Sequence, residues 1–305
     1  MKIPFLAPII PPHVFCLQEE GVTYARVRRD PSPGFEEARN FRYPSGSLGK
    51  SASGAPVLSR EAIAEAVKAA RALSGGRLSR ASVVYPDAWA KILPVELDAI
   101  PARGPAGAEM LLWKLKKLLP QTGGDLALVY EPMPVLSEEK RVLVAATPRD
   151  SIDAMERSFE ELGVRVGYLA PASLALFEGL APVLSAAASG DYALLHRSGG
   201  ALSFFIARGE APIFFRQRPP DEDGDHDREA RLSLSYYAER LKGPGIRAVY
   251  FHDEEAGDGL GEVSAFPVKP VAVTGRLFEA DADFDRRVAA RPELLAGFAA
   301  VYGRR

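Results

Sequence analysis

Apolar and polar residues along the first part of the chain alternate over short stretches and recur at helical spacing in others. Residues 13–17 and 22–27 are β-prone runs around Glu19, Glu20 and Gly21, which predicts a hairpin. Ser59 precedes a run with apolar residues three and four apart, which predicts a capped helix over residues 60–73. By the same criteria we expect strands at residues 41–43, 82–85, 90–97, 126–130, 142–146 and 164–169, and helices at residues 105–120, 150–163 (capped by Asp150) and 171–184.

From Tyr192 onward the pattern becomes a meander of three β-prone runs, residues 192–195, 202–207 and 212–215. A helix over residues 228–241, a buried-type strand over 248–251 and a closing helix over 292–302 follow. The second half therefore repeats the character of the first. We predict an α/β protein with two lobes, residues 1–188 and 189–305.

Composition and charge narrow the function classes. The 305 residues include 38 basic and 40 acidic side chains, so there is no basic field to collect nucleic acid, and we expect no nucleic-acid partner. The single cysteine, Cys16, excludes an intramolecular disulfide scaffold and is expected to be buried. No apolar run approaches the roughly 18 residues of a membrane span.

The N-terminal residues 1–12 contain too many prolines for a signal peptide. We interpret them as an extended leader that covers a sheet edge or docks to a partner, and we expect the protein to be cytoplasmic. Trp89 and Trp113 are expected to pack in the protein core.

Two motifs suggest ligand chemistry but fail at decisive positions. Gly49-Lys50-Ser51 matches the end of a P-loop, yet its opening glycine is replaced by Pro44 and no helix pattern follows, which favours a plain loop. The acidic run at residues 221–227 lacks the glycine and glutamate that a calcium loop requires, so a solvated connector is expected. The histidines have no recognised metal-binding spacing, and we predict no metal site from them.

The remaining candidate is the turn that contains Ser198, Gly199 and Gly200, between two predicted strands of the second half. Consecutive backbone N–H groups in such a turn can hold a phosphate. A Gly-Gly dipeptide is equally typical of an ordinary hairpin, so the residues alone leave both interpretations open.

The order of segments resembles the PilM family of actin-like proteins from about Val22 onward. The segments that carry the resemblance are residues 85–101, 110–120 with its Trp-Lys-Leu core, 141–146, 150–163, 170–176, 192–216, 229–241 and 294–301. The resemblance implies a two-lobed actin-like (ribonuclease H-like) fold, with a subdomain inserted in the first lobe and a C-terminal helix that returns to it. It also implies a cytoplasmic protein that binds ATP with magnesium and grips the tail of the inner-membrane protein PilN. The cytoplasmic part of GspL in type II secretion is related.

Three nucleotide motifs of that family are altered here. Gln18-Glu19-Glu20-Gly21 replaces an Asp-x-Gly motif near the N-terminus, and its two glutamates would repel a triphosphate. His196-Arg197-Ser198 replaces the second Asp-x-Gly, which removes the carboxylate that would organise magnesium and water. The residues that follow Phe251 are His252-Asp253-Glu254-Glu255, where a Gly-Gly turn would let the backbone approach adenine.

The leading hypothesis is therefore a cytoplasmic actin-like scaffold, held at the inner membrane by a PilN-like partner, with degenerate ATP binding and no enzymatic activity. The first alternative is an ATP-dependent switch or ATPase that places Arg197, Ser198, Gly199 and Gly200 around phosphate. The second is a small-molecule kinase of the same superfamily, for which the sequence offers no evident catalytic base.

Overall fold

The computed structural model describes residues 10–43, 58–102, 104–118, 125–134, 140–218, 226–255 and 266–303. The Gly49-Lys50-Ser51 motif and residues 221–225 of the acidic run lie outside these ranges, as do residues 1–9 of the N-terminal leader. At the end of the leader, the carbonyl of Pro11 accepts a hydrogen bond from Ser82 Oγ and that of Pro12 accepts one from Val27 N.

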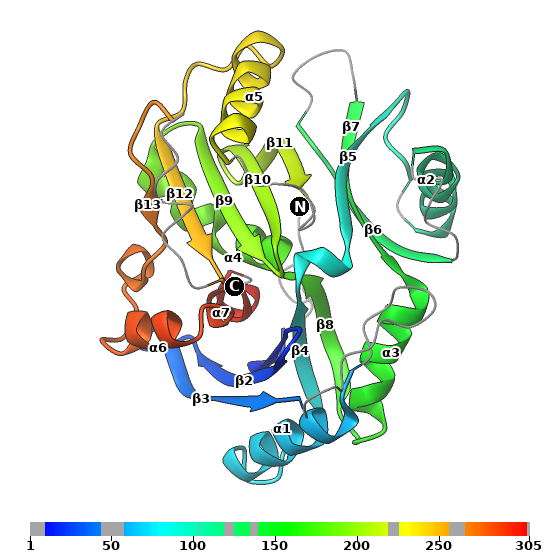
Figure 1. Ribbon diagram of the computed structural model, residues 1–305, viewed down its shortest axis with the longest axis vertical. Helices are drawn as coiled ribbons and strands as arrows, with labels where there is room; N and C mark the ends of the chain where they lie inside the picture. Colours follow the sequence, from blue (N-terminus) through cyan, green and yellow to red (C-terminus); the bar gives the residue numbers. More distant parts are fainter. Residues whose placement is uncertain are drawn as a thin grey trace.

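The first sheet has the strand order β3-β2-β1-β4-β8 (Figure 1). Its strands are β1 (His13–Leu17), β2 (Gly21–Arg28), β3 (Gly34–Arg42), β4 (Arg80–Tyr85) and β8 (Arg165–Pro171). The pairs β1/β2 and β2/β3 are antiparallel, whereas β1/β4 and β4/β8 are parallel. The sheet thus begins as an antiparallel meander and continues through parallel crossovers.

The second sheet repeats this plan with the order β11-β10-β9-β12-β13. Its strands are β9 (Tyr192–Ser198), β10 (Ala201–Arg208), β11 (Ala211–Arg218), β12 (Ala248–Asp253) and β13 (Val271–Ala272). Here too the first three strands are antiparallel, and β9/β12 and β12/β13 are parallel. The hairpins β1–β2 and β9–β10 therefore occupy equivalent positions in the two sheets.

A third sheet, of order β5-β7-β6, lies between β4 and β8 in the sequence. It contains β5 (Lys91–Leu97), β6 (Leu126–Pro132) and β7 (Lys140–Pro148), and α2 (Pro105–Leu118) packs on it with Leu111 and Leu115 fully buried. We refer to residues 91–148 as the inserted subdomain.

Helices separate and cover the two five-stranded sheets. Figure 1 shows α7 (Leu294–Tyr302) between them, and α4 (Ala172–Ala188) contacts strands of both sheets. Gly179 of α4 lets the two helices approach so closely that an added Cβ would lie 2.0 Å from the Ala299 carbonyl oxygen. The helices α1 (Arg60–Leu73) and α3 (Arg149–Glu160) contact strands of the first sheet. The remaining elements are α5 (His226–Glu239), α6 (Phe284–Ala290) and the short 3-10 helices η2 (Asp87–Trp89) and η4 (Gly275–Phe278).

The strands β9 and β10 of the second sheet are buried on both faces, which explains their nearly continuous apolar runs. Leu194 and Phe205 face α4 and belong to the large core, whereas Leu195 and Phe204 face α5 and belong to a separate cluster. Alternation along β9 thus divides the side chains between two cores.

Several sequence expectations need correction. Trp113 is not a core residue, because 62% of it is exposed. β3 spans nine residues instead of the expected three: its outer positions carry polar side chains, as is typical of an edge strand. Asp150 does not cap α3, which begins at Arg149 after Pro148 and has no side-chain cap bond. The short elements η4 and α6 were not expected.

Two expectations about single residues are met. Cys16 is buried as predicted, and Trp89 is partly buried and packs against the large core.

Candidate functional site

The candidate residues 197–200 form the turn of the β9–β10 hairpin, at one end of the second sheet. Gly199 and Gly200 have φ angles of +60° and +78°, a conformation that favours glycine. An added Cβ on Gly199 would lie 2.8 Å from Pro86 Cβ, so the turn packs against the segment that leads from β4 into the inserted subdomain. The structure therefore brings all four residues together, and the turn packs against the first half of the chain.

The parallel pairing of β9 with β12 places an acidic segment beside this turn. His252 pairs with His196 and Asp253 with Arg197, so Glu254 and Glu255 follow directly alongside the hairpin. The backbone N–H of Glu254 donates to the Arg197 carbonyl at 3.0 Å. The altered residues 252–255 and the hairpin thus form one site.

Three donors of the hairpin that would suit a phosphate are bonded to carboxylates of this segment. Arg197 donates from Nε and Nη2 to the two Asp253 oxygens, at 2.8 and 2.5 Å. Ser198 Oγ donates to Glu254 Oε2 at 2.5 Å, and the backbone N–H of Gly200 donates to Glu255 Oε1. The carboxylates of residues 253–255 therefore act as internal anions on the hairpin. We call residues 253–255 the acidic strip.

Asp87 joins the hairpin region to the first half of the molecule. Its carboxylate is fully buried and accepts hydrogen bonds from Ser173 N at 2.9 Å and from Ser203 Oγ at 2.8 Å. Its carbonyl accepts one from Gln217 Nε2 at 3.1 Å, and the Gln217 amide oxygen accepts one from Ile92 N at 2.8 Å. Asp87 thus links η2, α4, β10 and β11 through one buried polar network.

His196 lies between two buried carboxylates. Its Nδ1 is 3.7 Å from Asp87 Oδ2 and its Nε2 is 3.3 Å from Glu254 Oε1. Burial on its own lowers the pKa of His196, but the two carboxylates outweigh that effect and raise the pKa to about 9. The site therefore favours positive charge at this position.

The neighbouring His252 is held neutral. Its ring stacks on that of His196 with 5.5 Å between centroids, and its Nε2–H donates to the Pro292 carbonyl at 2.8 Å. Burial, followed by the positive charge of His196, lowers the pKa of His252 to about 3.

The sequence expectation of no metal site from the histidines rested on spacing alone. The structure brings His196, His252 and Glu254 together, with one potential ligand atom of each within 4.8 Å of the others. The pairing of β9 with β12 brings these residues together although His196 and His252 are more than fifty residues apart in the sequence. Local spacing therefore could not reveal the group. Asp87 was missed for the same reason, because its partners Ser173 and Ser203 come from distant elements and nothing in its sequence neighbourhood indicates its burial.

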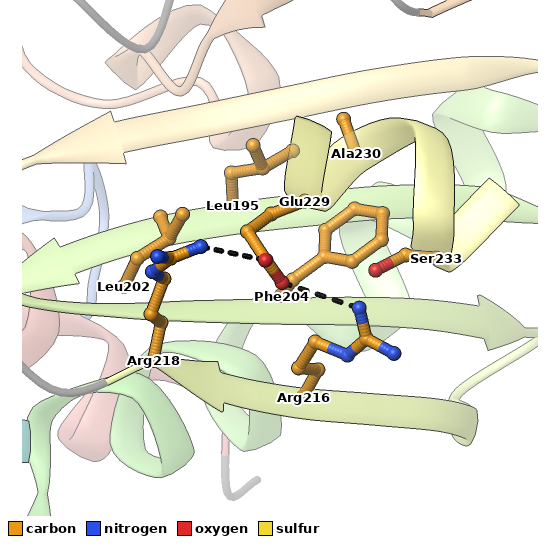
Figure 2. Close-up of a pocket in the computed structure, with 8 residues that line it drawn as sticks. All are labelled: Leu195, Leu202, Phe204, Arg216, Arg218, Glu229, Ala230 and Ser233. Atoms are coloured by element: carbon orange, nitrogen blue, oxygen red, sulfur yellow. Dashed lines mark hydrogen bonds and ion pairs between the residues drawn. The ribbon is translucent and has the colours of Figure 1, made fainter. Parts of the chain in front are cut away.

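A small pocket lies on the other face of the second sheet, beneath α5. Figure 2 shows Glu229 between the guanidinium groups of Arg216 and Arg218, at 3.2 and 2.6 Å. The cavity volume is about 10 Å³, which is close to the space of one water molecule. The pocket is therefore an ion-paired packing contact between α5 and the sheet.

Comparison with known proteins connects this geometry to a fold. No protein-family model and no curated protein sequence matches the chain. Among solved structures, a PilM-PilN type IV pilus biogenesis complex is similar with a TM-score of 0.67 at 15% identity, covering 96% of this chain and 99% of that one. A Bacteroides thetaiotaomicron protein of unknown function with an actin-like ATPase fold has a TM-score of 0.52 at 10% identity, covering 97% and 98%. The chain has an actin-like fold, which confirms the predicted fold class.

A weaker similarity links the chain to the cytoplasmic domain of EpsL, an inner-membrane component of the Vibrio cholerae type II secretion system. Its TM-score is 0.42 at 11% identity, over 79% of this chain and 81% of that one, which is too low to assign a system. None of the helices in the described ranges combines the length and apolar character that a bilayer crossing requires.

Proposed function

We propose that this protein is an actin-like scaffold of a type IV pilus or type II secretion platform at the inner membrane, with a degenerate nucleotide site. It would work from the cytoplasm and dock the tail of a PilN-like membrane protein, with lobes at residues 1–188 and 189–305. The observation that carries the degenerate site is the bonding of the β9–β10 hairpin donors to the acidic strip. The likeness to a PilM-PilN complex over nearly the whole chain supports the partner class.

The acidic strip opposes nucleotide binding in two ways. A triphosphate at this hairpin would have to displace carboxylates that already satisfy Arg197, Ser198 and Gly200. Like charges about 4 Å apart repel by roughly 4 kcal/mol near a protein surface, so each remaining carboxylate would add to the penalty. His196 also stands where a magnesium-organising carboxylate is expected from the family pattern. ATP with magnesium is therefore not proposed as a resident cofactor.

An ATP-dependent switch built on Arg197, Ser198, Gly199 and Gly200 is the rival function. It requires the acidic strip to leave the hairpin when nucleotide arrives. Arg197 then binds phosphate, so Arg197→Ala abolishes any ATP affinity. The rival and the scaffold are distinguished by a direct titration with Mg-ATP, because only the switch predicts binding in the micromolar range.

The inserted subdomain is the surface that we assign to the partner. Six large apolar side chains are exposed among the described residues, and four of them belong to this part of the chain or to its connecting loops: Ile100, Met110, Trp113 and Val129. Trp113 and Met110 lie on α2, where Lys117 places its ammonium 3.6 Å from the centre of the Trp113 ring. An apolar side chain rimmed by cations is typical of a surface that receives a short peptide with apolar anchors.

The docking proposal is tested with a labelled peptide that corresponds to the cytoplasmic tail of a PilN-like membrane protein from the same organism. We expect the labelled tail peptide to bind the purified protein, and Trp113→Ala to weaken binding at least tenfold, because exposed tryptophans at interfaces carry much of the binding energy. Leu232→Ala is the matched control, since Leu232 is 47% exposed on α5 in the second half. Failure of the wild-type protein to bind any such tail contradicts the scaffold. Equal binding by both variants contradicts only the assigned surface.

A further inference from the structure

Three potential metal ligands meet at the end of β9 and β12. His196 and His252 are cross-strand partners in the parallel ladder, and Glu254 follows two residues after His252. Both histidines are buried, and Glu254 exposes only 7% of its side chain. One donor atom from each of the three lies within 4.8 Å of the other two. Two imidazoles and a carboxylate are a donor set that zinc accepts in proteins.

The contact between His196 and Glu254 lacks the geometry of a hydrogen bond. His196 Nε2 is 3.3 Å from Glu254 Oε1, yet both atoms are buried and neither has a hydrogen-bond partner. Buried polar atoms without partners are rare and call for a bound ion or another cause. Four ligands at about 2.0–2.1 Å around zinc lie about 3.3 Å from one another, so this separation matches one edge of a zinc tetrahedron.

The opposite nitrogens of both rings face acceptors. His252 Nε2–H donates to the Pro292 carbonyl at 2.8 Å, which leaves the lone pair on Nδ1. His196 Nδ1 lies 3.7 Å from Asp87 Oδ2, which is beyond hydrogen-bond distance, so this carboxylate acts on the ring through its charge. A hydrogen-bond acceptor behind a ligating histidine, such as the Pro292 carbonyl behind His252, fixes the tautomer of the ring and raises its basicity.

We propose that His196, His252 and Glu254 bind one divalent transition-metal ion of the zinc class. The ligand atoms are Nε2 of His196, Nδ1 of His252 and a carboxylate oxygen of Glu254. The two rings are stacked within 11° of parallel, so binding tilts one of them to point Nδ1 of His252 at the ion. Imidazole ligands select zinc, copper or nickel over magnesium and calcium.

The ion neutralises charge at the centre of the site. It replaces a proton as the cation that faces Glu254, and it ties β9 to β12 beside the hairpin. Asp87 faces His196 and accepts hydrogen bonds from Ser173 and Ser203. An ion bound to His196 therefore also stabilises the contact between the second sheet and the first half of the chain. The proposal is independent of partner docking and of ATP.

The test uses the full chain, stripped with a chelator and titrated with Zn²⁺ by calorimetry, and with Co²⁺ as a visible-absorption probe. We expect one ion per chain, the d–d bands of a tetrahedral Co²⁺ site, and a rise in the thermal midpoint on Zn²⁺ addition. Glu254→Gln keeps the side-chain shape and an oxygen for Ser198, and should weaken Zn²⁺ binding at least tenfold. His252→Ala should remove it.

His13→Asn is the matched control, because His13 is also buried but pairs with the Tyr24 hydroxyl at 3.0 Å in the first sheet. This variant should bind Zn²⁺ as the wild-type protein does. Far-UV circular dichroism establishes that Glu254→Gln is folded before its affinity is compared. Wild-type protein that takes up no Zn²⁺ or Co²⁺ overturns the proposal and leaves His196 as a protonated bridge. Equal binding by wild type and by folded Glu254→Gln overturns it as well.

Discussion

The β1–β2 and β9–β10 hairpins occupy equivalent places in two sheets of the same strand order, but their turns differ in chemistry. In the first, Glu19 and Glu20 are exposed, and the turn is held by backbone hydrogen bonds such as the one from Tyr43 N to the Glu20 carbonyl. In the second, the turn packs on Pro86 and its donors are bonded to the acidic strip. The first hairpin is a surface turn, whereas the second is held by hydrogen bonds to carboxylates and by packing against Pro86.

This difference indicates where the molecule concentrates its polar interactions. A duplicated topology places both turns at the same point of each sheet, so topology alone does not decide their roles. Side chains from elsewhere in the chain decide it: Asp87 from η2 and the acidic strip after β12. Changes in the second hairpin should therefore affect stability much more than changes in the first.

The largest effect is expected from Asp87→Ala. This change leaves the N–H of Ser173 and the hydroxyl of Ser203 without their acceptor in a buried site, and it removes one of the two carboxylates that face His196. Loss of a partner in a buried charged network typically costs about 3–5 kcal/mol of unfolding free energy. Urea unfolding measures it, with Glu19→Ala in the first hairpin as control. A loss below about 1 kcal/mol would contradict the role of Asp87.

Gly199→Ala should come next, and Gly209→Ala is its matched control. The two glycines have φ angles of +60° and +59°, so alanine pays the same backbone penalty of about 1–2 kcal/mol at both. A Cβ added to Gly199 would clash with Pro86, whereas nothing lies within 4 Å of a Cβ added to Gly209. Overpacking should add roughly 1–3 kcal/mol for Gly199→Ala. Equal unfolding free energies would show that the hairpin is not pressed onto the first half.

Asp191, at the opposite end of β9 from the hairpin, provides a pH-dependent comparison. Burial would raise its pKa, but hydrogen bonds from Arg208 and Tyr237 outweigh burial and lower it in the folded state. A lowered pKa means that the ionised form stabilises the fold above the ordinary value of 3.8, and that this stability is lost as the pH falls through the lowered pKa. Asp191→Asn should cost about 1–3 kcal/mol at pH 7.

The difference in urea midpoint between wild type and Asp191→Asn should shrink between pH 5 and pH 2. A difference that is constant over this range would mean that the Asp191 carboxylate gains nothing from Arg208. Such a result would also argue against a stabilising role for the carboxylate–arginine contacts of the second sheet.

The smallest effect is expected in the first hairpin. Glu19→Gln with Glu20→Gln removes two exposed charges and leaves the backbone hydrogen bonds of the turn intact. The unfolding free energy should change by no more than about 0.5 kcal/mol. A loss as large as that of Gly199→Ala would remove the contrast between the hairpins.

The sequence predicted the elements that have strong apolar patterns and missed those that depend on distant partners. Helix 60–73 was predicted at its observed bounds, because burial of one face sets its periodicity. The three strands of the β9–β11 meander were located correctly, but β9 and β11 extend three or more residues beyond the apolar runs that predicted them. The polar edge strand β3 carries little of that signal.

The candidate site was predictable only in part. The Gly-Gly turn and the family resemblance drew attention to residues 197–200, and the departures in residues 252–255 were evident. That these two segments bond to each other depends on the parallel register of β9 and β12, which no local pattern encodes. The burial of Asp87 depends in the same way on α4 and β10.

A titration of the wild-type protein with Mg-ATP tests the central claim that the acidic strip takes the place of a nucleotide at the second hairpin. We predict no binding heat and no change in thermal midpoint at 1 mM Mg-ATP. A site with an affinity of about 10 μM would stabilise the fold by about 2.7 kcal/mol at that concentration, which a thermal scan detects readily. Micromolar binding that is lost in Arg197→Ala would contradict the account.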